Sequence, residues 1–159
     1  MGRKGTVQEA IRQQRPLRSQ RQEAFLALLL AAEEVRARFV THFAAEEGLT
    51  LQQYNVLRIL RGAGAAGLPT LEIAERMIER TPGVTRLVDR LIDKKLVQRE
   101  RSEEDRRQVW CQLTARGRQL LARFDDEVDA IEEHAFGCLK ADELRTLIQL
   151  LDKVRNHQP

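Results

Sequence analysis

The stretch RTPGVTRLVDRL (Arg80–Leu91) combines a Pro-Gly pair with an apolar stripe at helical spacing. Its apolar residues recur at three- and four-residue steps, which places them on one face of a helix. They are Val84, Leu87, Val88 and Leu91. Thr81 is a suitable N-cap, Pro82 suits the first helical position, and Gly83 has no side chain to hold the backbone away from a neighbour. The pattern therefore predicts a helix that begins at Pro82.

The other face of this helix is polar and carries two Arg residues. Its side chains are Thr85, Arg86, Asp89 and Arg90. Taken alone, the stretch fits two structures equally well. One is an ordinary amphipathic helix with a good cap, and the other is a helix whose N-terminus meets a negatively charged partner.

A second short helix is predicted directly before this one. It follows Pro69, and its apolar residues are expected to turn inward. These are Leu71, Ile73, Ala74 and Met77. Two short helices joined by a tight turn form a helix-turn-helix candidate.

The sequence after Leu91 changes its period and predicts a β-hairpin. LVQRER (Leu96–Arg101) and RQVWCQLT (Arg107–Thr114) contain β-branched and aromatic residues and flank the polar turn SEED. A helix-turn-helix followed by a basic hairpin is the outline of a winged helix, whose second helix can enter the major groove of DNA. With the hairpin added, DNA binding becomes the favoured interpretation of the Arg80–Leu91 stretch.

The hairpin tip is rich in Arg, and an Arg on a thin loop can enter a narrow minor groove. The candidate side chains are Arg99, Arg101, Arg106 and Arg107. Three acidic residues at the tip would repel phosphates, and we expect one of them, Asp105, to pair with a neighbouring Arg and set the turn. Without its position after a helix-turn-helix, such a charge run would be interpreted as a solvated turn.

Helices are predicted on both sides of the winged helix. A long helix over 21–47 ends at Gly48, and Thr50 and Gln53 have the spacing of a capping box for the next one. After Thr114 one long helix ends near Gly137, and the segment KADEL opens a last helix. The predicted division is a basic, loosely ordered arm with at most a short helix (1–20), an N-terminal dimerisation helix (21–48), the winged helix-turn-helix (49–113) and C-terminal dimerisation helices (114–159).

Composition favours one mainly helical domain that is not in a membrane. The chain has 159 residues, 42% of them hydrophobic, and its longest apolar run is Ala24–Ala32, whereas a membrane span needs about 20 residues. No convincing cleavage signal follows that run, so we expect a cytoplasmic protein. Charge is uneven: residues 1–22 carry six Lys and Arg against one Glu, and residues 119–159 carry five against nine Asp and Glu. A polyanion should therefore meet only part of the surface.

Five segments between Leu49 and Leu121 resemble the DNA-binding core of the MarR family of bacterial transcription regulators. They are LTLQQYNVLRIL, LEIAERM, VTRLVDRL, KKLVQRERSEEDRRQV and LTARGRQLL. The wing pattern Asp105-Arg106-Arg107, followed by LTARG, is the most specific of the matches. The resemblance implies a homodimeric repressor on a palindromic operator, with the helix over 84–91 in a major groove and Arg107 in a minor groove. The terminal helices would form the dimer interface, and they are more apolar than a monomer of this size needs.

Two positions depart from the family pattern. Lys95 stands where many members have Gly; if this position is left-handed, Lys costs about 1 kcal/mol. Pro69 stands where a capping Ser or Thr is common. Neither departure threatens the predicted fold.

Members of this family often respond to small aromatic acids, oxidants or metals. A pocket for a small aromatic or anionic effector could use Phe39, His42, Tyr54 and Arg58, although the favoured interpretation is that Phe39 and Tyr54 are core and Arg58 is solvated. The first helix has no Cys, which argues against sensing of oxidants there. Cys111 and Cys138 are expected to be reduced, part-buried thiols.

No cofactor and no metal site are expected. His42 and His134 lie near Glu residues, but no tight two-ligand spacing is present. The chain has no Gly-rich phosphate loop and no nucleophile with a partner His, which argues against an enzyme. The alternative to a DNA-binding regulator is a winged-helix module that acts mainly through protein contacts.

Overall fold

The structure is a computed structural model that describes residues 5–79, 82–101 and 109–157, with the backbone alone for 42–47 and Arg101. The helices are α1 (Val7–Ala10), α2 (Gln20–Glu47), α3 (Leu51–Ala63), α4 (Thr70–Arg76), α5 (Val84–Asp93), α6 (Ala115–Phe136) and α7 (Ala141–Arg155), with a 3₁₀ turn, η1, over Gly64–Ala66. The strands are β1 (Leu68–Pro69), β2 (Val97–Arg101) and β3 (Val109–Leu113). The expected fold class, mainly α with a small β-sheet wing, is confirmed.

The sheet has three antiparallel strands in the order β1-β3-β2. β2 and β3 form the predicted hairpin, in which Val97 pairs with Leu113 and Arg101 with Val109. β1 pairs with the other edge of β3 and was not expected from the sequence. A two-residue strand that ends in Pro is too short to show an alternating pattern.

The cap predicted for α3 is present. The Thr50 hydroxyl accepts from the Gln53 backbone N–H at 3.2 Å, and the Gln53 side chain accepts from the Thr50 N–H at 3.0 Å. The capping box satisfies two donors that a helix N-terminus leaves unpaired. The N-cap of α4 is Pro69, which makes no side-chain cap bond.

The predicted start of α5 is wrong. Pro82 and Gly83 lie in a turn, the N-cap is Gly83, and the helix begins at Val84. Gly83 has φ 97° and ψ 28°, a left-handed conformation that cannot continue a right-handed helix and that favours glycine. Thr81, the predicted N-cap, lies outside the described residues.

The segment LTARG connects α6 to the end of the helix-turn-helix. The Thr114 hydroxyl donates to the Lys95 carbonyl at 2.8 Å and accepts from the Gly117 N–H at 3.0 Å. A Cβ on Gly117 would lie 2.2 Å from the Leu96 carbonyl oxygen, so only glycine allows this approach of helix to chain. Lys95 has φ 59°, which is the left-handed conformation. In this conformation we expected Lys to cost about 1 kcal/mol relative to Gly.

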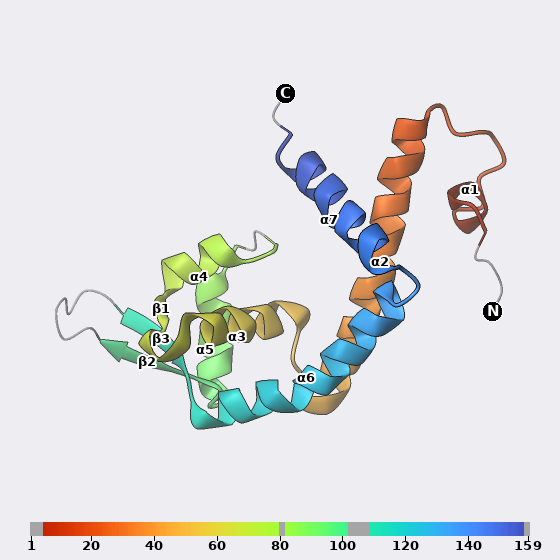
Figure 1. Cartoon of the computed structure of the whole chain (residues 1–159). Coiled ribbons are helices and arrows are strands. Elements are labelled where there is room, and N and C mark those ends of the chain that lie inside the picture. The colour runs from red at the N-terminus through yellow and green to blue at the C-terminus, as the bar shows by residue number, and fades with distance from the viewer. Residues whose placement is uncertain (1–4, 80–81, 102–108, 158–159) are drawn as a thin grey trace.

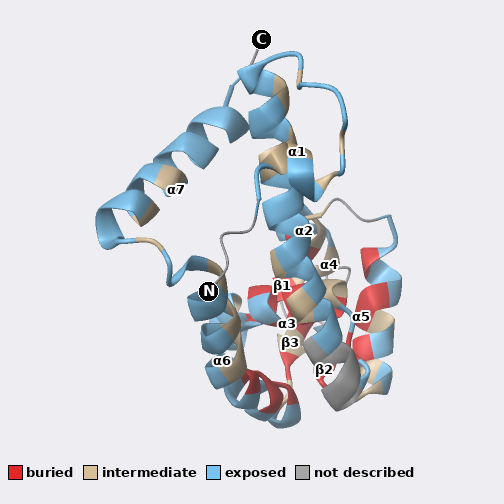
Figure 2. Ribbon diagram, turned by 90° about the vertical axis from the view of Figure 1, so that its right-hand side faces the viewer, coloured by how far each residue is buried: buried red, intermediate tan, exposed pale blue. Residues whose placement is uncertain are grey.

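The core lies in the winged helix, as Figure 2 shows. Its buried apolar side chains run from Leu49 to Phe124, and the most deeply buried include Val56, Leu57, Ile73, Val88, Leu91, Cys111 and Leu121. Leu71 was expected to face inward, but it is 72% exposed. Because Leu71 lies two residues before buried Ile73, the helical period of about 100° per residue places them on opposite sides of α4.

The long helices extend away from this core (Figure 1). α7 has no buried residue, and large apolar side chains are exposed along α2, the end of α6 and α7. They include Phe25, Leu28, Leu29, Val40, Phe136, Ile148, Leu150, Leu151 and Val154. Among the described residues, no helix is both long enough and apolar enough to span a membrane. The helices therefore present apolar surface that the rest of the described chain leaves uncovered.

The two cysteines differ in environment. Cys111 is buried in β3, whereas Cys138 is exposed after α6, and both are free thiols. The expectation of part-burial is wrong for each of them. A hydrogen bond of 3.6 Å between the Cys111 sulfur and the Thr70 hydroxyl connects β3 to the start of α4.

Candidate nucleic-acid interface

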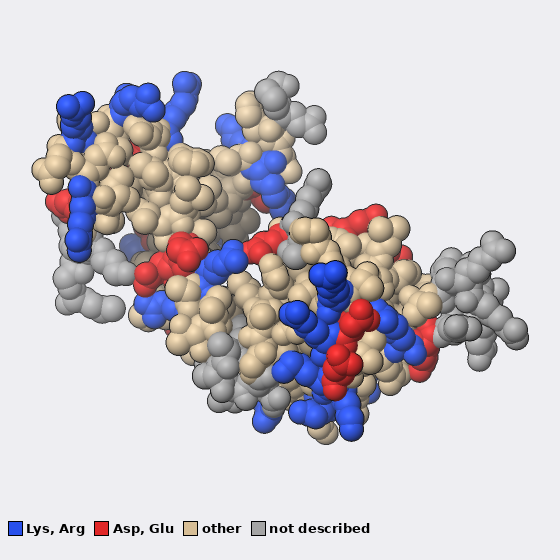
Figure 3. All heavy atoms as spheres, turned by 180° about the vertical axis from the view of Figure 1, so that it is seen from behind, with Lys and Arg blue, Asp and Glu red and all other residues tan. Residues whose placement is uncertain are grey.

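α5 buries one face and exposes the other. Its apolar stripe of Val84, Leu87, Val88 and Leu91 is buried, as the spacing predicts. Thr85, Arg86 and Arg90 are exposed on the opposite side. Figure 3 shows Lys and Arg side chains gathered over this region of the molecule around a group of acidic ones. The buried stripe fixes the helix, and the exposed side carries its cationic groups outward.

The N-terminus of α5 has no side-chain cap. The Gly83 carbonyl accepts from the backbone N–H groups of Arg86 and Leu87 at 2.9 and 3.2 Å. The aligned peptide dipoles make a helix N-terminus attractive to anions. No described residue other than its chain neighbours lies within 4 Å of a Cβ built on Gly83.

Asp89 and Arg99, two of the predicted DNA-binding residues, bind each other. A carboxylate oxygen of Asp89 on α5 lies 2.7 Å from a guanidinium nitrogen of Arg99 on β2. Asp89 is half-buried, and the Arg99 side chain is 34% exposed. The ion pair connects the helix to the wing, so these two residues are placed to fix the angle between the elements.

The base of the wing is described and its tip is not. β2 and β3 are paired up to Arg101 and Val109. The predicted wing residues Asp105, Arg106 and Arg107 lie outside the described residues, and of Arg101 only the backbone is described. The described part of the wing, β2 and β3, therefore lies beside α5 (Figure 1).

A cavity of about 520 Å³ lies between the long helices and the winged helix. Three of the four predicted pocket residues, Phe39, Tyr54 and Arg58, line it; the side chain of His42 lies outside the described residues. Much of the remaining wall is apolar. It includes Ala32, Val35, Leu51, Met77, Ile78 and Val128. Tyr54 is buried in the core, Phe39 packs against it and Arg58 is exposed, as the favoured interpretation from sequence predicts, and all three also line this cavity.

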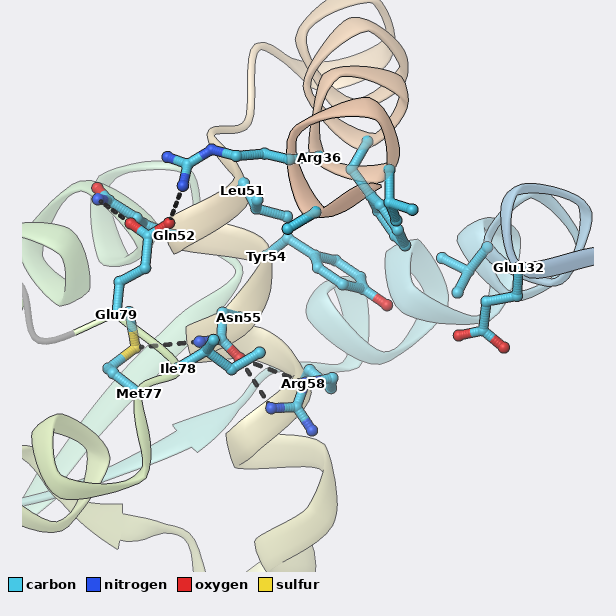
Figure 4. Close-up of a pocket in the computed structure, with 14 residues that line it drawn as sticks. Arg36, Leu51, Gln52, Tyr54, Asn55, Arg58, Met77, Ile78, Glu79 and Glu132 are labelled. Carbon is cyan, nitrogen blue, oxygen red and sulfur yellow. Dashed lines mark hydrogen bonds and ion pairs between the residues drawn. The ribbon is translucent and has the colours of Figure 1, made fainter. Parts of the chain in front are cut away.

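Polar groups at the cavity are held by defined contacts (Figure 4). Arg58 donates two hydrogen bonds to the Asn55 amide oxygen, at 2.8 and 3.3 Å, and the Asn55 amide donates to the Met77 sulfur at 3.7 Å. The centroids of the Tyr54 and Phe39 rings lie 6.4 Å apart. Burial raises the pKa of the Tyr54 hydroxyl, against the opposing effect of nearby Arg61 and Arg58. Tyr54 is therefore a neutral hydrogen-bonding group at neutral pH.

The sequence did not reveal three other contacts of these surfaces. Neither the Asp89–Arg99 ion pair nor the contacts of Glu79 with Arg36 and Gln52 at the cavity has a local motif. The partners are 10, 43 and 27 residues apart, as the numbering shows. Opposite charge is the only signal that the sequence offered for the two ion pairs.

An exposed basic helix, held beside a β-hairpin by a buried apolar stripe and an ion pair, defines a winged helix-turn-helix protein that binds DNA. Comparison with known proteins agrees. The family model described as "MarR family" matches residues 49–109. The chain is 28% identical over 130 residues to the transcriptional regulator HosA of Escherichia coli O157:H7. The aligned region covers 79% of this chain and 95% of HosA.

Solved structures give the same result. The MarR transcription factor of Planctomyces limnophilus is 41% identical, with a TM-score of 0.65 over 86% of this chain and 98% of that one. Bordetella bronchiseptica BpsR, whose DNA binding is regulated by 6-hydroxynicotinic acid, is 26% identical, with a TM-score of 0.71 over 83% and 92% of the two chains. The chain belongs to the MarR family of transcription regulators, which are DNA-binding proteins and not enzymes.

Proposed function

We propose that two copies of this chain form a homodimeric repressor that binds a palindromic operator and is released by a small ligand. The observation that carries the proposal is the exposed polar face of α5, with Arg86 and Arg90 outward and Asp89 tied to the wing. In each protomer α5 would enter a major groove and Arg107 of the wing an adjacent minor groove.

The uncovered apolar side chains of α2 and α7 support the dimer. Phe25 is 60% exposed and Val154 66% exposed, on helices that lie on the same side of the molecule, away from α5 (Figure 1). Large exposed apolar surfaces mark association sites. Two-fold symmetry of the dimer would require a two-fold related operator.

The contacts of the predicted DNA-binding residues support different roles for them. Arg86 and Arg90 are exposed and would reach bases or phosphates, together with Thr85. Pro82 and Gly83, in the turn before α5, would lie against the phosphate backbone, where the helix N-terminus favours an anion. Asp89 and Arg99 would act through each other by holding the wing at its angle.

The cavity supports relief by an effector. It combines an apolar wall with Arg58 and the neutral Tyr54 hydroxyl, a combination that suits a small aromatic molecule with a polar or anionic group. BpsR, a related regulator, responds to such a molecule. Binding between the long helices and the winged helix would change the spacing of the two α5 helices in a dimer.

The test is a titration of the neighbouring intergenic DNA, labelled and followed by fluorescence anisotropy at several salt concentrations. We expect a specific site and a steep loss of affinity with salt, because released counterions drive binding to phosphates. Binding to every sequence with the same slope would contradict specific readout. Weak, salt-insensitive binding would favour the alternative, a module for protein contacts.

Two variants assign the contacts. Arg86→Ala should lower the preference for the operator over other sequences by about 1–3 kcal/mol if it binds a base. Arg107→Ala should weaken operator binding and leave dimerisation unchanged. Arg145→Ala on α7, which removes the same charge from another helix, is the matched control. Equal losses for Arg86→Ala on all sequences would make it a phosphate contact, and unchanged affinity of Arg107→Ala would remove the wing from the mechanism.

A further inference from the structure

The basic arm before α2, described over residues 5–19, is held against that helix. α1 packs on α2, and the apolar side chains of the arm, Val7, Ile11 and Leu17, are half-buried. The Ser19 hydroxyl accepts from the Gln22 N–H at 3.2 Å where α2 begins. The arm therefore has a defined place beside the end of α2 that is remote from the winged helix (Figure 1).

The arm and the start of α2 carry four exposed arginines. Among the described residues, none of these side chains forms an ion pair. They are Arg12, Arg15, Arg18 and Arg21. Arg21 lies one turn before Phe25, which is 60% exposed, on the same face of α2. Figure 3 shows basic side chains at this end of the molecule, apart from those over α5. The arginines thus adjoin the apolar surface that is proposed for dimerisation.

A row of carboxylates on α6 has the opposite charge. Asp126, Asp129 and Glu133 follow one another at three- and four-residue steps, so they share one face of the helix. All three are exposed, and none of them forms an ion pair with a described residue. Phe136, which is 39% exposed, continues the same face three residues later. The acidic row therefore also adjoins exposed apolar surface.

The arm and the acidic row do not bind each other within one chain. In the described part of the chain, no ion pair joins residues 5–21 to α6. Each surface combines uncovered apolar side chains with unpaired charges of one sign, and the signs are opposite. In a two-fold dimer, a contact between the arm of one copy and α6 of the other forms twice.

We propose that the basic arm of each copy binds the acidic row on α6 of a second copy. The apolar surfaces of the terminal helices supply burial, and the charges fix which ends meet. An exposed ion pair is weak alone, but about six of them act together in the two contacts. The proposal rests on the proposed function, because it concerns the proposed homodimer.

The test measures the dimer dissociation constant of the full chain by analytical ultracentrifugation. An arm variant and an α6 variant should each weaken the dimer at least about ten-fold at low salt, because like charges then meet in both contacts. The arm variant carries Arg12→Glu, Arg15→Glu and Arg18→Glu. The α6 variant carries Asp126→Lys, Asp129→Lys and Glu133→Lys. Both losses should shrink as salt is raised, since salt screens exposed charges.

An equimolar mixture of the two variants tests whether the contact joins different copies. In the mixed dimer each reversed arm meets a reversed α6, and each original arm meets an original α6. The mixture should therefore recover dimers of about wild-type affinity. A contact within one chain would not recover, because every chain would keep its own like charges.

A control separates the position of the charges from the net charge. It adds the same charge as the α6 variant, but at exposed positions of the winged helix, with Glu75→Lys, Asp93→Lys and Glu100→Lys. This control should dimerise like wild type and should not pair preferentially with the arm variant. Preferential pairing as strong as that of the α6 variant would reduce the effect to net charge and overturn the proposal.

The remaining outcomes also decide the question. Wild-type affinity in the arm variant or the α6 variant, or no recovery in their mixture, would overturn the contact between arm and α6. An arm variant that dimerises like wild type but loses affinity for all DNA would assign the arm to DNA instead. A wild-type chain that stays monomeric would contradict the proposed homodimer itself, whereas a wild-type dimer that is insensitive to the arm contradicts only this inference.

Discussion

The winged helix and the long helices solve the burial of apolar side chains in opposite ways. In the winged helix, Leu57, Val88 and Leu91 are fully buried, and the described core lies between Leu49 and Phe124. α7 has as clear an apolar stripe, but none of its residues is buried. A similar helical pattern thus produces a finished core in one region and an open surface in the other.

The difference separates the region that stabilises the folded chain from the region that is available for assembly. Burial of apolar surface is the main favourable contribution to folding, so the single chain is stabilised chiefly by its winged helix. The exposed stripes of α2 and α7 can contribute only when a second surface covers them. Folding of the DNA-binding region and assembly of the proposed dimer should therefore respond to different substitutions.

The largest expected effect is on the core of the winged helix. Leu57→Ala should lower the free energy of unfolding by about 2–5 kcal/mol, because it removes buried methyl groups and leaves a cavity. Leu150→Ala on α7, where the side chain is 57% exposed, is the matched control. Urea denaturation at low protein concentration measures both. Equal losses would show that the two regions do not differ as their burial indicates.

The next effect is on assembly. Ile148→Glu on α7 should weaken the proposed dimer by about 2 kcal/mol or more, since it places a charge at the centre of an apolar surface. Gln149→Glu adds the same charge to the neighbouring exposed position and should have little effect. Analytical ultracentrifugation over a range of concentrations measures the dissociation constant. A dimer of Ile148→Glu as tight as wild type would place the interface elsewhere.

The sequence predicted those parts of the fold that depend on local pattern. The long helices follow from their apolar period, the cap of α3 from Thr50 and Gln53, and the hairpin from β-branched and aromatic residues on either side of a polar turn. Local reasoning was insufficient at Leu71, because α4 has only seven residues and two apolar faces compete for the core. At Gly83 a helix start and a left-handed turn use the same residues, Pro and Gly.

The candidate site was predicted in part for the same reason. The exposed face of α5 follows from its period, and three residues of the cavity were named as a pocket candidate. The Asp89–Arg99 ion pair and the contacts of Glu79 join different elements, so only the packed fold brings their atoms together. Whether Thr85, Arg86 or Arg90 reads a base depends on DNA and stays a prediction.

The smallest expected effect is within the well-packed region, at the joint between α5 and the wing. Lys95 has φ 59°, where a side chain is strained, so Lys95→Gly should raise the free energy of unfolding by about 1 kcal/mol. Lys94→Gly is the control: Lys94 has φ −75°, and glycine there should lower it by about 0.5–1 kcal/mol. Urea denaturation of the two variants at one protein concentration measures the difference. Lys95→Gly keeps the backbone carbonyl that accepts from the Thr114 hydroxyl. A loss of stability in this variant would therefore mean that the lysine side chain contributes more than its backbone strain costs. A gain would show that burial in the winged helix is sufficient to hold one unfavourable residue in place, which the long helices, without a covered face, could not do alone.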